Sequence, residues 1–124
     1  MSKNIVLEKS FDFALDIVKL YLRLKNEKEY TLSNQLVRSA TSIGANITEA
    51  QYSPSKKDFI NKMNIALKEA NESEYWLKLL VKAEIIKDKE YRIYYDSCSE
   101  IKAILIQIVK NSRSSIDIND KGIV

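Results

Sequence analysis

The 124-residue sequence contains no histidine, two glycines, one proline and one cysteine. Because histidine is the most common general base and metal ligand in proteins, its absence excludes most familiar small active sites. Two glycines are too few for a phosphate-binding loop of the P-loop or dinucleotide kind. The single Cys98 excludes an internal disulfide, and its position on a predicted apolar seam favours a buried thiol over a nucleophile. We therefore expect no catalytic residue, cofactor, metal or small-molecule substrate.

The carboxylates give little support to a metal site. Helical bundles that hold two metal ions pair glutamates with Glu-x-x-His motifs, which need histidine. Glu69 and Glu72 are one turn apart, but Lys68 flanks them and Glu49 is the only obvious carboxylate on a facing helix. A solvated charged face is the better interpretation.

Long apolar runs are also missing. The longest run, near residues 103–109, is interrupted by Gln107 and is far shorter than the roughly 20 residues of a membrane span. The N-terminal letters MSKNIV lack the apolar core of a signal peptide. We expect a cytoplasmic protein without membrane contact. The net charge is +3, with ten basic and seven acidic residues in 1–62 and ten of each in 63–124, so any basic patch must be local.

The residues that are abundant favour helix, and turn signals separate four helical segments. These run from about residue 8 to 28, from 31 to near Pro54, from 55 to about 84, and from about 90 to 113. Ser55 and Asp58 have the spacing of a capping box at the third start. We predict an all-α, up-down-up-down antiparallel four-helix bundle over residues 1–113, followed by a flexible C-terminal tail, 114–124.

The first predicted helix carries two apolar stripes, although a helix in a monomeric bundle needs one. The first stripe is Phe11, Leu15, Val18 and Leu22, and the second is Phe13, Ile17, Leu20 and Leu24. The extra stripe predicts either a self-assembly surface or a helix buried on both sides.

The segment 38–50, RSATSIGANITEA, carries charge only at Arg38 and Glu49. Helical spacing divides it and its flanks into three faces. The core seam is Leu36, Ala40, Ile43, Ile47 and Ala50, the small-residue ridge is Ala40, Gly44 and Thr48, and the polar stripe is Arg38, Ser42, Asn46 and Glu49. Arg38 and Glu49 are roughly 16 Å apart along the axis, so each needs a partner elsewhere. The candidates are Glu74 and Lys78 of the third helix, either in the same chain or in a neighbouring subunit. The stripe is either a polar seam or subunit contact, or a ligand site.

This segment resembles the R-x-x-x-S-I-x-x-N-I-x-E-G signature of a bacterial family, the four helix bundle or 23S ribosomal RNA intervening-sequence proteins. Six residues match: Arg38, Ser42, Ile43, Asn46, Ile47 and Glu49. Ala50 replaces the usual glycine. The later segment KKDFINKMNIALKEANESEYWLKLL resembles the family's continuation at Asp58, Phe59, Ala66, Glu74 and Leu77, so the resemblance covers residues 8–113.

The resemblance implies a bundle that assembles into a ring-like homo-oligomer, a pentamer. It also implies kinship with the accessory variability proteins of diversity-generating retroelements, which are basic bundles that bind nucleic acid and a reverse transcriptase.

Two basic groups are candidates for contact with RNA phosphates. They are Lys56, Lys57 and Lys62 at the start of the third helix, and Arg23, Lys25 and Lys28 at the opposite pole. Both groups either bind RNA or only keep the surface soluble. Five aromatic residues either stack on bases or pack near the last turn: Tyr75, Trp76, Tyr91, Tyr94 and Tyr95.

We therefore expect a non-enzymatic homo-oligomeric scaffold that binds structured RNA or a ribonucleoprotein. The alternative is a protein-interaction module that recruits a partner enzyme without itself contacting nucleic acid.

Overall fold

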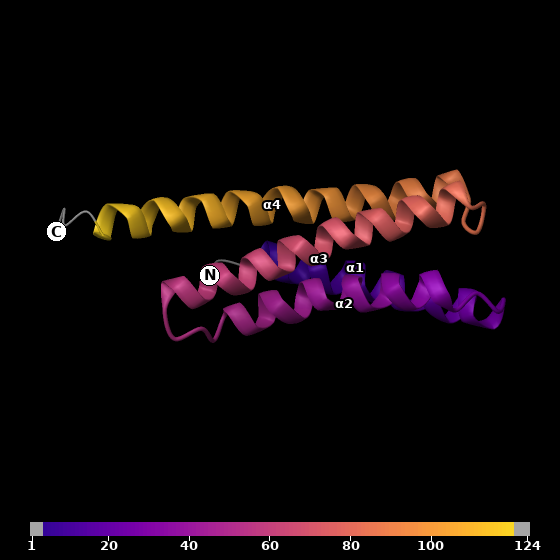
Figure 1. The fold of residues 1–124 in the computed structure, drawn as a ribbon, viewed down its shortest axis with the longest axis horizontal. Coiled ribbons are helices and arrows are strands. Elements are labelled where there is room, and N and C mark those ends of the chain that lie inside the picture. The colour runs from indigo at the N-terminus through magenta and orange to yellow at the C-terminus, as the bar shows by residue number, and fades with distance from the viewer. Residues whose placement is uncertain (1–3, 121–124) are drawn as a thin grey trace.

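Helix dominates the chain because few residues interrupt it. The computed structural model describes the backbone of residues 4–120 and the side chains of residues 4–115. It contains α1 (Ile5–Asn26), α2 (Thr31–Ala50), α3 (Lys56–Lys82) and α4 (Asp88–Asp120), and no strand occurs in this part of the chain. Successive helices run in opposite directions (Figure 1). The prediction of an all-α, up-down-up-down antiparallel bundle is confirmed.

The turns between helices follow local rules. Ser55 caps α3, because its hydroxyl accepts a hydrogen bond from the Asp58 amide at 3.1 Å and donates one to the Asp58 carboxylate at 2.9 Å. Ser55 is therefore the N-cap, as the capping-box spacing predicted, but the reciprocal bond of a capping box from the Ser55 backbone N–H to the Asp58 side chain is not formed among the described residues. After α1 and α3 the chain turns at Lys28 and Glu84, whose φ angles of 68° and 62° lie in the left-handed region that commonly ends helices.

The last helix is longer than predicted. The sequence analysis ended it near Arg113 and expected a tail over residues 114–124, but α4 continues through Asp120 and extends past the ends of the other helices (Figure 1). Residues 114–120 contain neither glycine nor proline, so a missing apolar stripe does not stop the helix. The predicted end of the helix is therefore seven residues too early. The flexible tail over residues 114–124 stays a prediction, and residues 121–124 lie outside the described part.

One apolar face of each helix forms the core. The predicted core seam of α2 and the second stripe of α1, Phe13 to Leu24, are buried, and Cys98 on α4 is fully buried. The contact of α2 with α3 is the most extensive and that of α1 with α4 the least. At the α2–α3 contact the buried hydroxyl oxygens of Ser39 and Ser73 are 2.9 Å apart. Small side chains let these two helices approach closely.

Candidate interaction surfaces

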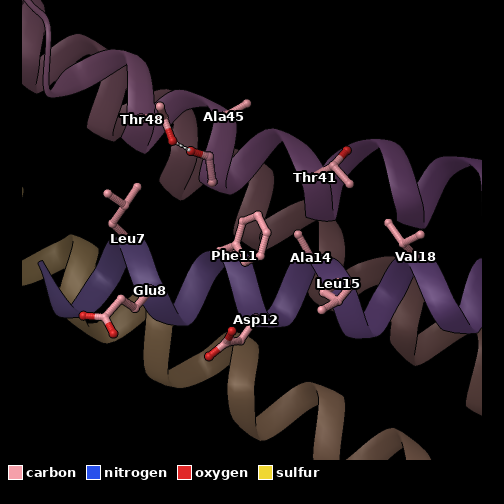
Figure 2. A pocket seen from close by; sticks show the side chains of 11 residues that line it. Leu7, Glu8, Phe11, Asp12, Ala14, Leu15, Val18, Thr41, Ala45 and Thr48 are labelled. Atoms are coloured by element: carbon pink, nitrogen blue, oxygen red, sulfur yellow. Dashed lines mark hydrogen bonds between the residues drawn. The ribbon is translucent and has the colours of Figure 1, made fainter.

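The first apolar stripe of α1 lies on the outside of the molecule. Phe11 is 68%, Leu15 44% and Leu22 58% exposed. Burial within the bundle, one of the two expectations for this stripe, therefore does not occur. A groove of about 730 Å³ runs beside the stripe between α1 and α2. Figure 2 shows Phe11 and Val18 reaching from α1 toward α2, while the carboxylates of Glu8 and Asp12 point to the other side of α1.

The groove exists because α2 presents small side chains to α1. Thr41, Gly44, Ala45 and Thr48 form its α2 wall. Gly44 faces Ser10 of α1, and a Cβ added at Gly44 would lie 3.3 Å from the Ser10 hydroxyl oxygen. The predicted small-residue ridge thus serves the approach of α1 to α2 within one chain. Larger side chains would fill the groove.

The predicted polar stripe of α2 finds most of its partners within its own helix. Ser42 donates to the Arg38 carbonyl at 2.7 Å, and the Asn46 amide donates to the Ser42 carbonyl at 2.8 Å. The Arg38 guanidinium donates to the Gln35 side chain at 2.7 Å. Glu49 pairs with Lys62 of α3 at 2.8 Å. The four residues stay on one helix face, but they do not enclose a pocket.

Within one chain, Glu74 and Lys78 are not the partners of this stripe, and pairing with these residues of a neighbouring subunit stays a prediction. Glu74 does not pair with Arg38, because its carboxylate accepts from Lys102 and Ser99 of α4, each at 2.8 Å. Lys78 is far from Glu49: the residue paired with Glu49 is Lys62, and Lys78 lies 16 residues farther along α3, roughly 24 Å. The register of α2 and α3 keeps Lys78 away from Glu49, whereas Glu74 fails to pair with Arg38 because it is turned toward α4.

Glu69 is the carboxylate of α3 whose pKa is affected by the charge of Arg38. One of its carboxylate oxygens is buried with no hydrogen-bond partner among the described residues. Burial raises the pKa of Glu69, the neighbouring Glu72 raises it further, and the positive charge of Arg38 opposes this shift. The expected facing carboxylate, Glu49, is paired elsewhere. Within the described residues no group of three or more potential metal ligands comes together.

The predicted basic groups are only partly free. Arg23 forms a two-point ion pair with Glu90, whose second contact is 2.8 Å, and Lys62 is paired with Glu49. Lys25 lies 5.9 Å from the centre of the Tyr21 ring. Lys56 contacts the Ser115 hydroxyl at 3.4 Å. Lys57 and Lys28 are exposed. Each predicted group therefore offers fewer free charges than its composition suggests.

The sequence analysis missed a longer basic surface on α3. Its lysines are Lys57, Lys68, Lys78 and Lys82, and between them lie Asn61, Asn64, Asn71 and Tyr75. These eight residues, which we call the α3 outer stripe, follow each other at alternating steps of four and three on the face opposite the core. The alternating spacing of four and three residues could have identified this stripe from the sequence, because the same spacing identified the core seam. It was applied only to apolar residues.

The aromatic residues divide between packing and exposure. Tyr75 is 58% exposed and meets Trp76 edge to face, with ring centres 5.0 Å apart. Tyr91 and Tyr95 pack on each other, and the Tyr94 hydroxyl contacts Glu90. Trp76 and the tyrosines of α4 are partly buried, as packing near the last turn requires. Of the five aromatic residues named in the sequence analysis, Tyr75 is the one that presents its ring largely to solvent.

Comparisons with known proteins agree with this architecture. Residues 2–107 match the model of a family described as 23S rRNA-intervening sequence protein. A solved structure of a protein with unknown function from the S23 ribosomal protein family of Bacteroides thetaiotaomicron VPI-5482 is 53% identical. The match covers 85% of this chain and 98% of that one, with a TM-score of 0.84. No curated protein matches. None of the described helices is both long and apolar enough to cross a membrane.

Proposed function

Because the chain belongs to the 23S rRNA-intervening sequence protein family, we propose that it is a non-enzymatic scaffold that assembles with copies of itself and contacts structured RNA or a ribonucleoprotein. The exposed apolar stripe of α1 beside the α1–α2 groove carries this proposal. Apolar patches of this kind mark interaction sites on soluble proteins. The occupant we propose is a second copy of the chain.

Charge supports a second copy as the occupant. The only charged residues that line the groove are Glu8 and Asp12, whereas the chain as a whole carries a net charge of +3. The acidic rim of one copy therefore faces a neighbour whose exposed lysines are of opposite sign. In a ring each subunit presents two different surfaces, so the groove meets another part of the neighbour rather than the same groove. We propose a pentamer, as the family resemblance implies.

RNA phosphate is the partner that fits the exposed lysines at the start of α3. Lys56 and Lys57 are exposed at the start of α3 and lie outside every ion pair found among the described residues. Lysine contacts supply most of the sequence-independent affinity for nucleic acid. The absence of histidine and of a metal-binding group in the described residues leaves no catalytic arrangement to propose.

The assembly is tested by measuring mass in solution. We expect the wild-type protein to have the mass of an oligomer by native mass spectrometry and light scattering. Changing Phe11→Glu and Leu15→Glu places two charges on the stripe and should give a folded monomer, because burying unpaired carboxylates is costly. Ile93→Glu on α4, 62% exposed, is the matched control and should leave the mass unchanged. A monomeric wild type, or an unchanged mass for the stripe variant, contradicts the proposal.

RNA binding is tested separately with the purified wild-type protein. Its affinity for a labelled RNA hairpin should fall as salt rises, because binding to phosphates releases counterions. If the protein is instead a module that recruits a partner enzyme, purified protein will show no salt-sensitive RNA binding while a protein partner is captured.

A further inference from the structure

We infer that the α3 outer stripe is the surface that holds RNA, with its lysines on phosphates and Tyr75 stacked on an unpaired base. This inference rests on the proposed function and gives it a site. The stripe extends over 26 residues, from Lys57 to Lys82, and its 25 helical steps span about 38 Å of straight helix. None of its eight positions is acidic.

The lysines of the stripe are free to bind an anion. Lys57, Lys68, Lys78 and Lys82 are exposed, and none belongs to an ion pair within the described residues. This distinguishes them from Arg23, Lys62 and Lys102, which are already paired with glutamates. A free ammonium group keeps its full attraction for phosphate, whereas a paired one must first give up its partner.

The carboxylates beside the stripe do not cancel its charge. Glu74, on the edge toward α4, accepts from Lys102 and Ser99. Asp58, at the start of α3, accepts from the Ser55 hydroxyl. Glu69 has one buried oxygen, and its charge acts on Arg38 of α2 as well as on Lys68 of the stripe. Glu74 is the carboxylate neutralised by a cation, so Asp58, Glu69 and Glu72 remain against four lysines. The surface as a whole is therefore positive.

The uncharged members of the stripe also suit RNA. Asparagine amides both donate and accept hydrogen bonds, so Asn61, Asn64 and Asn71 match phosphate oxygens, ribose hydroxyls and base edges. Tyr75 lies between Lys68 and Lys78 with 58% of its surface exposed. Proteins bind single strands and loops by such a combination of positive charge and an aromatic platform. A lysine-only surface would attract acidic proteins equally, and the tyrosine favours nucleic acid.

The test compares two variants of equal net charge. One changes Lys68, Lys78 and Lys82 to glutamine, and the control makes the same change at Lys19, Lys89 and Lys110, which are exposed on α1 and α4 and belong to no ion pair within the described residues. Binding of a fluorescein-labelled RNA hairpin with a single-stranded loop is measured by anisotropy from 0.1 to 1 M salt. Losing three phosphate contacts should flatten the slope of log affinity against log salt by about 2, or about 100-fold in affinity at 0.1 M salt. The control should bind like the wild type.

Tyr75 provides a second measurement that charge alone would not affect. Tyr75→Ala should weaken binding of the looped hairpin about tenfold, and Tyr75→Phe should restore it, because stacking needs the ring and not the hydroxyl. A blunt RNA duplex, which offers no free base, should be insensitive to both changes. Since Trp76 is the only tryptophan and touches Tyr75, its fluorescence should change when the hairpin binds. A DNA hairpin of the same sequence separates phosphate contact from recognition of ribose.

Each contrary outcome has its own meaning. If the wild type binds RNA but the α3 variant keeps its affinity, the stripe inference is wrong and the proposed function stands. Equal losses in both triple variants mean diffuse attraction and overturn the stripe as a site. If the α3 variant changes its mass in solution, the stripe is a subunit contact, and if it loses a protein partner only, it is a protein-binding surface. A wild type that binds no RNA removes the RNA part of the proposed function itself.

Discussion

Alanine at Gly44 tests whether the α1–α2 approach is limited by one hydroxyl group. Replacing glycine inside a helix by alanine stabilises the helix by about 1 kcal/mol. In this chain the new Cβ would lie 3.3 Å from the Ser10 hydroxyl oxygen, closer than ordinary van der Waals contact. Extra volume in a packed contact costs about 1–3 kcal/mol. We therefore expect Gly44→Ala to be between neutral and about 2 kcal/mol destabilising.

Removing the Ser10 hydroxyl should reverse that result. In a Ser10→Ala background the next contacts of the new Cβ are the Ser10 Cβ and carbonyl carbon, both 3.7 Å away, which is an ordinary distance. Gly44→Ala should then stabilise the protein by the full helix term of about 1 kcal/mol. Ser10→Ala alone loses a 3.0 Å bond to the Leu7 carbonyl and should change stability by less than about 1.5 kcal/mol.

Urea unfolding followed by circular dichroism gives the four free energies of this double-mutant cycle. All are measured at one protein concentration, because the proposed self-association would make stability concentration-dependent. Ala103→Gly, at an exposed position of α4, calibrates the helix term and should cost about 1 kcal/mol. If Gly44→Ala has the same effect with and without the Ser10 hydroxyl, that group does not set the helix distance and the reasoning fails.

Three further predictions concern ionisable groups. Lys102→Met should cost about 1–3 kcal/mol in urea unfolding, because the mostly buried Glu74 loses its counter-charge. Hydrogen bonds from Arg23 hold the pKa of Glu90 below its usual range. The stability that this pair contributes is therefore fully present above the ordinary carboxylate pKa and is lost as pH falls through the lowered pKa of Glu90. Glu90→Gln should lower the free energy of unfolding by at most about 1 kcal/mol at pH 7 and should not lower it in acid. Burial and Glu74 raise the pKa of Cys98 to about 12, so a thiol reagent at pH 8 should label it only on unfolding.

Features fixed by neighbouring residues could be predicted from the sequence. The four helices follow from apolar spacing, and the start of α3 follows from Ser55 and Asp58, because both signals act within one or two turns. The end of α4 could not be predicted in this way. Its continuation over residues 114–120 needs no signal at all, only the absence of a breaker.

Features that depend on how helices face each other were beyond the sequence. Ser39 meets Ser73 and Glu49 meets Lys62, so the α2 and α3 positions in contact have numbers that sum to 112 and 111. By that register Glu74, one of the two candidate partners, lies at the height of Arg38. It projects instead toward α4, where Lys102 neutralises it. The position of a residue along a helix axis follows from its number. Which neighbouring helix its charged side chain pairs with depends on how all four helices pack.

The positions of the two proposed surfaces make assembly and RNA binding interdependent. Among the described residues α1 and α3 share no contact, since each packs only on α2 and α4, so they are diagonal in the bundle. A ring in which the α1–α2 groove meets a surface of the neighbour other than its α3 outer stripe leaves the stripe of every copy uncovered, and a long RNA can then engage several stripes at once. Linked sites of this kind gain 10²–10⁴-fold in apparent affinity.

The monomeric variant Phe11→Glu, Leu15→Glu separates these contributions. Its α3 stripe is intact, so we expect a hairpin short enough for one stripe to bind it as it binds the wild type. An RNA long enough to span two subunits should bind at least about tenfold more weakly to the variant, because only the multivalent gain is lost. Both RNAs are measured by the same anisotropy titration. If the variant binds both equally weakly, RNA lies on the α1 face itself, and the assignment of assembly to α1 and of RNA binding to the α3 outer stripe is refuted.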